Sequence, residues 1–224
     1  MQNNHWANAR AIQYELPEPH EYQSPLVDWP ADPRRSVLLV HDMQRYFVER
    51  FDQEQAPGRN LISNIASAVQ TARRFDIPVF YTAQPGNMTP EQRGLLKDFW
   101  GPGMTVAPDH RRVIDPLEPT ESDLILDKWR YSAFARSSLE NELKARNRDQ
   151  IVLCGVYAHV GVLATALDSY SKDYQTLIIA DAVADFDRER HLSTLDYLAR
   201  VAARVLPTSI VLKEWKERHA VTAK

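Results

Sequence analysis

Short, unbroken apolar runs alternate along this chain with segments of helical periodicity, and this alternation limits the folds open to it. Residues 36–41 read Ser-Val-Leu-Leu-Val-His, an apolar run of strand length. Because a strand with one exposed face alternates apolar and polar residues, an unbroken run predicts a strand covered on both faces. Comparable runs lie at residues 78–83, 123–126, 150–156 and 176–180, with a shorter one at 204–206.

Apolar residues at helical spacing occupy the segments between these runs. After Asn60, apolar residues recur with a helical period: Leu61, Ile65, Ala68, Val69 and Ala72. Asn60 directly precedes them and is therefore a candidate N-cap. Similar helical segments cover residues 137–146, 159–172 and 188–203. Strands that alternate with helices favour right-handed crossovers. We therefore predict an α/β fold, a three-layer α/β/α sandwich around a mainly parallel, Rossmann-like sheet of about six strands.

The length and composition fit one globular domain. The chain has 224 residues, of which 44% are apolar, and this is enough to bury a substantial core. Residues 1–33 are rich in Pro, Gln, Asn and acidic side chains. They predict an extended arm that wraps a surface or contributes to oligomer contacts, with plain disorder as the alternative. Residues 34–224 are predicted to form the single domain.

The charge, the cysteine count and the N-terminus narrow the classes of partner. A net charge of −3 argues against bulk attraction to nucleic acid or to anionic lipid. The single cysteine, Cys154, allows no intramolecular disulfide, and its place in an apolar run predicts a buried, inert thiol. Residues 1–10 lack an apolar signal core, and no run approaches the ~20 apolar residues of a membrane span. We expect a cytoplasmic protein without a nucleic-acid or membrane partner.

Polar or glycine residues follow four of the predicted strands. Asp42 closes the first, Gln84 follows the second, Lys128 follows the third, and the segment 155–161 follows the fourth. Ligands of open parallel sheets bind beyond the carboxyl ends of the strands, so these positions are expected to share one crevice. Taken singly, Asp42 reads equally well as a turn residue and Lys128 as a solvated charge. Their combination with the glycine-containing turn favours a ligand site.

Six segments resemble the isochorismatase family: Val-His-Asp-Met-Gln at 40–44, Tyr-Thr-Ala-Gln-Pro at 81–85, Phe-Trp-Gly-Pro-Gly at 99–103, Lys-Trp-Arg-Tyr-Ser-Ala-Phe at 128–134, Gly-Val-Tyr-Ala-His at 155–159 and Ala-Asp-Ala-Val-Ala-Asp-Phe at 180–186. The related cysteine hydrolases keep a cysteine nucleophile at the turn position that is Gly161 here. A covalent acyl-enzyme route is therefore closed at this position, and an amidase activity is disfavoured. Within the family, residues 44–47, 88–100 and 159–163 are most similar to the phenazine-pathway members.

This resemblance implies hydrolysis of a vinyl ether in a dianionic, chorismate-derived substrate. The expected reaction converts 2-amino-2-deoxyisochorismate to trans-2,3-dihydro-3-hydroxyanthranilate and pyruvate. The alternative is the siderophore-pathway reaction, from isochorismate to 2,3-dihydro-2,3-dihydroxybenzoate and pyruvate, and a catalytically silent binding protein is a distant third. No cofactor or metal is implied: the His and Asp spacings match no ligand set such as H-E-x-x-H, and His41 and His159 are expected to be structural. Family members are commonly homodimers.

The resemblance also assigns roles to individual residues. Asp42 matches the family's proton donor and is the expected general acid, Lys128 matches the second catalytic residue, and Gly161 marks the site without a nucleophile. Burial should raise the pKa of Asp42 and a charged Lys128 should lower it, and the sequence leaves the balance open. The residues expected to contact the substrate are Gln84, Arg93, Trp100, Tyr157 and Phe47.

Several of these assignments have plain structural alternatives. Arg93 could be a solvated charge, and the aromatic residues, with Trp129 and Tyr131 added, could be ordinary core. The Val156–Tyr157 peptide is cis in related structures, and the resemblance implies the same here.

Overall fold

The computed structural model describes residues 11–104 and 107–222, and it shows six strands in one parallel sheet in the order β3-β2-β1-β4-β5-β6. The strands are β1 (Ser36–His41), β2 (Val79–Ala83), β3 (Leu124–Asp127), β4 (Gln150–Val156), β5 (Gln175–Ala184) and β6 (Arg204–Leu206). The predicted fold class is confirmed, with a sheet that is parallel at every pairing of these strands.

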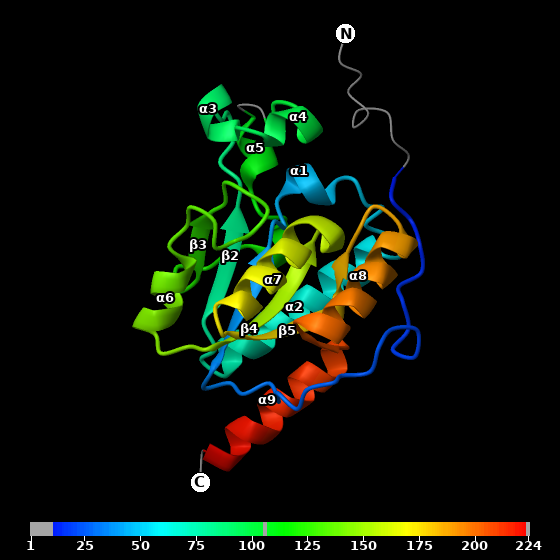
Figure 1. Ribbon diagram of the computed structural model, residues 1–224, viewed down its shortest axis with the longest axis vertical. Helices are drawn as coiled ribbons and strands as arrows, with labels where there is room; N and C mark the ends of the chain where they lie inside the picture. Colours follow the sequence, from blue (N-terminus) through cyan, green and yellow to red (C-terminus); the bar gives the residue numbers. More distant parts are fainter. Residues whose placement is uncertain (1–10, 105–106, 223–224) are drawn as a thin grey trace.

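Helices cover both faces of the sheet (Figure 1). Helices α2 (Gly58–Arg74) and α9 (Thr208–Thr222) pack on one face, and α6 (Leu139–Ala145), α7 (Leu163–Ser171) and α8 (Arg188–Val201) pack on the other. Strand β1 is apolar along its length because both of its faces are covered. Leu38 and Val40 belong to the buried cluster on one face, and Val37 and Leu39 belong to the cluster on the other. Each such side chain contributes about 1.5–3 kcal/mol through burial.

Element boundaries match the predicted runs at β1, β4 and β6, and they differ elsewhere. Strand β5 continues past the predicted end to Ala184. The N-cap prediction at Asn60 is wrong. Helix α2 begins at Gly58, two residues before Asn60, and Pro57 takes the cap position. Helix α9 was not singled out from its apolar spacing, since much of its surface is exposed and its core contacts centre on Val211 and Trp215.

Several short helices stand at the carboxyl end of the sheet (Figure 1). Helix α1 (Arg45–Val48) follows β1, and a π-helix, η2 (Ala158–Val162), leads into α7. The long connection from β2 to β3 contains α3 (Pro90–Arg93), α4 (Leu96–Trp100), α5 (Pro108–Arg111) and a 3-10 turn, η1 (Asp115–Leu117). This connection carries Arg93 and Trp100 above the strand ends.

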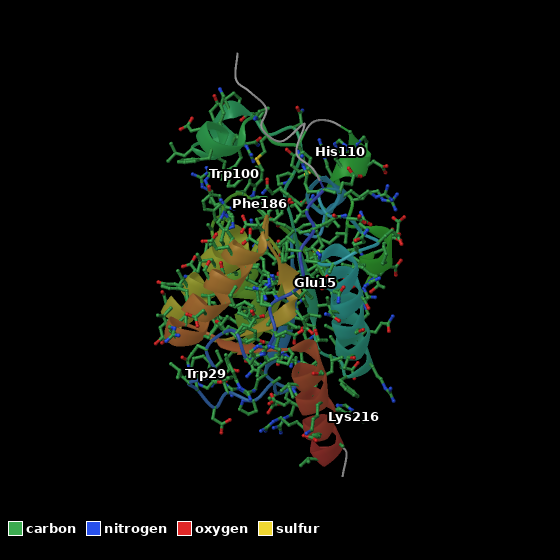
Figure 2. All side chains as sticks on the ribbon, turned by 90° about the vertical axis from the view of Figure 1, so that its right-hand side faces the viewer. Glu15, Trp29, Trp100, His110, Phe186 and Lys216 are labelled. Atoms are coloured by element: carbon green, nitrogen blue, oxygen red, sulfur yellow. The ribbon has the colours of Figure 1, made fainter. Side chains whose placement is uncertain are left out.

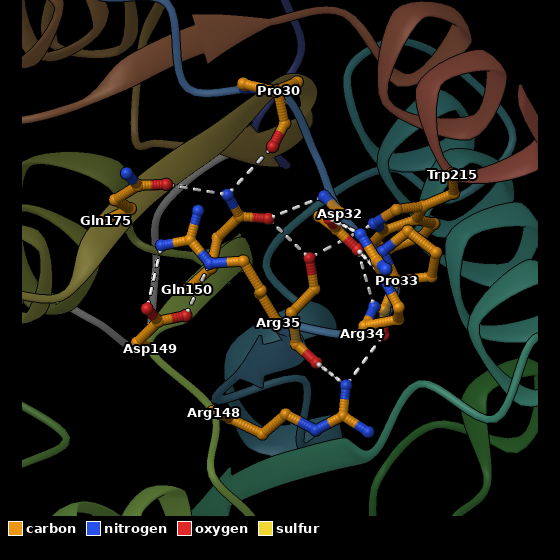
Figure 3. Close-up of polar contacts among 11 residues, drawn as sticks. Pro30, Asp32, Pro33, Arg34, Arg35, Arg148, Asp149, Gln150, Gln175 and Trp215 are labelled. Carbon is orange, nitrogen blue, oxygen red and sulfur yellow. Dashed lines mark hydrogen bonds and ion pairs between the residues drawn. The ribbon is translucent and has the colours of Figure 1, made fainter. Parts of the chain in front are cut away.

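The N-terminal segment is bonded to the amino end of the sheet through Gln150 (Figure 3). The Gln150 side chain donates to the Pro30 carbonyl at 2.9 Å and accepts from the Asp32 amide at 2.9 Å and from the Ser36 hydroxyl at 2.6 Å. Residues 1–10 of the expected arm lie outside the described residues, and the domain division at residue 33 stays a prediction. None of the described helices is long and apolar enough to cross a bilayer.

Two histidines buried in this fold, His41 and His191, predict a loss of stability in mild acid. Burial lowers the pKa of each from its ordinary value of 6.5 to about 4. The unfolded chain therefore binds more protons than the folded chain between these values. The free energy of unfolding should fall as the pH drops through this window, by up to about 3 kcal/mol per histidine.

Urea unfolding at about pH 7 and about pH 4 measures this loss. His191→Gln should reduce the loss by up to about 3 kcal/mol, because only His41 of the two histidines then resists protonation; carboxyl groups such as Glu21, whose pKa the fold lowers, add to the loss in both proteins. A free energy of unfolding that is constant across the window in the unsubstituted protein would contradict the prediction.

Candidate active site

Neighbouring strands bring four predicted positions to one cavity. Lys128, Gln84, Asp42 and Tyr157 follow β3, β2, β1 and β4, which are consecutive in the sheet order. The space of this cavity is about 660 Å³ when the open solvent at its mouth is counted. Its lining contains every residue predicted for the site: Asp42, Phe47, Gln84, Arg93, Trp100, Lys128, Tyr157 and Gly161.

The carboxyl group of Asp42 is enclosed by hydrogen-bond donors. Oδ2 accepts from Lys128 Nζ at 2.9 Å, and Oδ1 accepts from the Thr82 hydroxyl at 2.6 Å. Asp42 is 5% exposed and Lys128 is 3% exposed. Burial is the largest single influence on the pKa of Asp42, and it raises the pKa. The combined lowering by Lys128, His41 and Thr82 is larger than this increase, so the pKa lies below its ordinary range. The balance that the sequence left open therefore favours an ionised carboxylate in the ligand-free site.

Gln44 fixes the loop that carries Gln84. The buried Gln44 amide accepts from the Gln84 backbone N–H at 2.8 Å and donates to the Gln84 carbonyl at 3.0 Å and to the Arg111 carbonyl at 2.9 Å. Two opposed hydrogen bonds to one backbone unit hold the exit of β2 against the start of α1. Gln44 lies in the segment 40–44 that resembles the family, but the sequence does not reveal which residues its amide contacts.

Arg93 is buried, which overturns its alternative reading as a solvated charge. It is 5% exposed, and its guanidinium donates to the Gly101 carbonyl at 3.0 Å and to Gln84 Oε1 at 3.2 Å. Gly103 has a φ of +79°, and a Cβ there would lie 2.9 Å from Arg93 Cζ. A glycine at 103 therefore lets the chain pass close to the guanidinium.

Aromatic rings form one wall of the cavity. Trp100 Nε1 donates to the Tyr131 hydroxyl at 2.6 Å. Figure 2 shows Trp100 close to Phe186, and their ring centroids lie 6.1 Å apart. The ring centroids of Phe186 and Tyr157 lie 4.2 Å apart. The Tyr157 hydroxyl donates to the Phe47 carbonyl at 2.9 Å. Tyr131 lines the cavity, and Trp129 is not among its lining residues.

His41 fills the space beside Gly161. A Cβ at position 161 would lie 2.2 Å from His41 Cε1. His41 Nδ1 lies 2.9 Å from the Val156 carbonyl, which can only accept, so we assign the ring proton to Nδ1. Nε2 is then left to accept from Thr165 Oγ1 at 3.3 Å. The expected cis peptide between Val156 and Tyr157 is present.

His159 and Cys154 have structural surroundings. His159 Nδ1 lies 2.7 Å from Asp185 Oδ1, and the His159 backbone N–H donates to Asp185 Oδ2 at 2.6 Å. The His159 amide, at the start of the π-helix η2, is thus hydrogen-bonded to the protein's own Asp185 carboxylate. Cys154 is fully buried, and burial raises its thiol pKa. Across residues 11–104 and 107–222, no three His, Cys, Asp or Glu side chains are grouped to hold a metal ion.

Some lining residues were not singled out from the sequence: Tyr46, Arg50, Leu96, Val156 and Val160. Tyr46 stands in the quoted segment 44–47 and Leu96 in the quoted segment 88–100, so position within a motif was the signal available for them. Arg50 lies outside every quoted segment, and nothing in its local sequence distinguishes it from a surface arginine.

The contact between position 161 and His41 predicts that Gly161→Ala is destabilising. The added methyl must displace the imidazole and weaken its hydrogen bond to Val156. Overpacking of this kind costs about 1–3 kcal/mol, which should lower Tm by about 2–10 °C. Gly101→Ala is the comparison: a Cβ there meets nothing within 4 Å, but its φ of +64° gives that variant backbone strain without a clash, whereas Gly161 has no positive φ. A Gly161→Ala protein with the Tm of the unsubstituted protein would contradict the prediction.

Several known proteins are similar to this chain in sequence or in fold. The family model described as the isochorismatase domain matches residues 36–209. The phenazine biosynthesis protein PhzD of Pseudomonas fluorescens is 49% identical over 201 residues, which cover 90% of this chain and 96% of that protein. Enterobactin synthase component B of Escherichia coli (strain K12) is 45% identical over 199 residues, covering 89% of this chain and 70% of that protein.

Two further relatives extend the comparison. The isochorismatase of Bacillus subtilis (strain 168) is 43% identical over 203 residues, covering 90% of this chain and 65% of that protein. Among solved structures, a cysteine hydrolase from Pseudomonas syringae pv. phaseolicola 1448A superimposes with a TM-score of 0.80 at 25% identity, covering 87% of this chain and 99% of that one. The match to the family model and the identity to these relatives show that this chain is a hydrolase of the isochorismatase family.

Proposed function

We propose that this enzyme removes the enolpyruvyl group of 2-amino-2-deoxyisochorismate by hydrolysing its vinyl ether, with Asp42 as general acid. The observation that carries the proposal is the buried carboxyl group of Asp42, paired with Lys128 in a cavity where position 161 has no nucleophile. Vinyl-ether hydrolysis suits such a site, because it requires a proton donor and a water molecule and no covalent intermediate.

The charges that line the cavity complement a substrate with two carboxylates. Among the described lining residues, the cationic side chains of Arg93 and Lys128 stand beside the carboxylate of Asp42. Burial of a carboxylate is unfavourable without charged or hydrogen-bonding partners. We assign Arg93 and Gln84 to one carboxylate and the enolpyruvyl group, and Trp100, Tyr157 and Phe47 to the walls that exclude water.

Binding of the substrate prepares Asp42 to donate a proton. The two substrate carboxylates offset the surrounding cations, so the pKa of Asp42 rises and the carboxyl group takes up a proton. Asp42 then protonates the terminal methylene carbon, and the ether carbon becomes an oxocarbenium ion. The ionised Asp42 stabilises this cation until water adds to it. The added water gives one proton back to Asp42. The resulting hemiketal then collapses to pyruvate as its hydroxyl proton passes to the ring oxygen, which leaves as the free ring hydroxyl.

The choice of an amino substrate rests on similarity. The relative with the higher identity is named for phenazine biosynthesis, whereas the two at 45% and 43% are named for enterobactin synthesis and as an isochorismatase. The lining residues include no carboxylate besides Asp42 that would select an amino group. Isochorismate is therefore the alternative substrate.

The test of this function is pyruvate release from both ring compounds, followed with a coupled lactate dehydrogenase. We expect turnover of both, a higher kcat/KM for the amino compound, and a kcat that falls as pH rises through the pKa of Asp42 in the complex. Asp42→Asn should lose nearly all turnover and still bind substrate, monitored by tryptophan fluorescence.

Two results would overturn the proposal. One is an Asp42→Asn protein that turns over at the rate of the unsubstituted enzyme. The other is a kcat that is flat from about pH 5 to about pH 9 while chemistry limits turnover. A higher kcat/KM for isochorismate would replace the amino compound with the alternative substrate and leave the mechanism intact.

Arg93→Ala tests the assignment of a substrate carboxylate to this arginine. Loss of a charge-assisted hydrogen bond should raise KM by at least about 10-fold and change kcat much less. Arg59→Ala is the matched control, because Arg59 is exposed and outside the cavity lining. An unchanged KM in Arg93→Ala would remove Arg93 from the substrate site.

A further inference from the structure

Thr82, whose hydroxyl helps to lower the pKa of Asp42, makes two hydrogen bonds to that residue. It lies in β2 beside the end of β1 and is 1% exposed. Its Oγ1 accepts from the Asp42 backbone N–H at 3.0 Å, and its hydroxyl donates to Asp42 Oδ1 at 2.6 Å. The hydroxyl thus joins the backbone and the side chain of one residue.

We propose that Thr82 is a positioning residue that reserves Asp42 Oδ1 as a hydrogen-bond acceptor, so that the proton given to the substrate is carried on Oδ2. This inference rests on the proposed function, in which Asp42 is the general acid. It adds the location of the catalytic proton, which a carboxyl group with two similar oxygens does not define.

The two oxygens of Asp42 differ in what a proton would displace. A proton on Oδ1 would face the Thr82 hydroxyl proton, and that hydroxyl would have to turn away. Among the described residues it has no second acceptor in hydrogen-bonding position, so turning away would leave a buried donor without a partner. A proton on Oδ2 leaves the bond from Thr82 to Oδ1 intact.

The surroundings of Oδ2 accommodate the proton. Oδ2 lies 2.9 Å from Lys128 Nζ and 3.7 Å from His41 Nδ1. When Oδ2 is protonated, the Lys128 ammonium group can turn its hydrogens toward the substrate carboxylates in the cavity, so it is not left without an acceptor. Lys128 lines the cavity, which places this side of the carboxyl group toward the substrate.

The titratable groups that face Asp42 come from three strand ends. They are His41 in β1, Lys128 after β3 and Tyr157 after β4. Burial keeps His41 neutral above about pH 4 and raises the pKa of Tyr157 well above its ordinary value. A fall in kcat between about pH 5 and about pH 9 therefore reports Asp42 in the complex.

The experiment compares the pH dependence of kcat in Thr82→Val, which keeps the side-chain shape and removes the hydroxyl, and Thr82→Ser, which keeps the hydroxyl. Removing a donor from the carboxylate raises its proton affinity. In the pH profile of kcat, we call the decline toward high pH the falling limb. We expect Thr82→Val to move this limb to higher pH by about one pH value, lower kcat about 10-fold at acidic pH, and change KM less than about twofold. Thr82→Ser should keep the limb at the pH of the unsubstituted enzyme.

Two controls separate positioning from general damage to the core. Thr176→Val removes another fully buried hydroxyl, bonded to Ser169 at 2.8 Å, and should leave the limb in place. Thr82→Cys, with a weaker donor of similar size, should place the limb between those of the Ser and Val proteins. The series Ser, Cys and unsubstituted enzyme keeps the test decisive if Thr82→Val does not fold.

The inference is overturned if the limb stays in place when the hydroxyl is lost, or if Thr82→Ser shifts it as far as Thr82→Val does. These results leave the proposed function standing. An unsubstituted enzyme that releases no pyruvate, or one whose kcat is flat with pH while chemistry limits turnover, would instead overturn the proposed function and this inference with it.

Discussion

The interaction on which the rest of the site depends is the buried pair between Asp42 and Lys128. Each charge alone would be costly at this depth, and together they are tolerable because Thr82 also donates to the carboxylate. Lys128 follows β3 and Asp42 follows β1, so the pair spans the end of β2, which lies between them. The same contact therefore links the ends of β1 and β3 and lowers the pKa of the residue proposed as general acid.

Much of the fold follows from local sequence because its cause is local. Runs such as Ser36–His41 are apolar throughout, since both faces of the strand are covered, and the predicted strand has the observed bounds. The gathering of Asp42, Gln84 and Lys128 was predictable from parallel topology, because parallel strands end at one edge of a sheet. The cap at Asn60 was mispredicted, because a favourable residue type does not fix where the first helical turn begins. The homodimer and the cytoplasmic location remain predictions.

The rest of the site depends on distances that a sequence does not contain. The direction of the Asp42 pKa follows from contacts with Lys128 and Thr82, which are 86 and 40 residues away in the chain. The imidazole beside Gly161 explains why the position is closed to a side chain, although the sequence shows only that glycine stands there. Arg50 reaches the cavity without any motif to mark it. In each case the missing information is which residues face one another.

In the proposed reaction, binding of a dianion converts Asp42 from a carboxylate to a carboxylic acid. Proton uptake on binding tests it most directly, with the substrate analogue whose enolpyruvyl group is reduced to a lactyl ether, which cannot be protonated at carbon. Calorimetry at about pH 7 in buffers of different ionisation enthalpy should show uptake approaching one proton per site in the unsubstituted enzyme and almost none in Asp42→Asn. Equal uptake by the two proteins would contradict the claim.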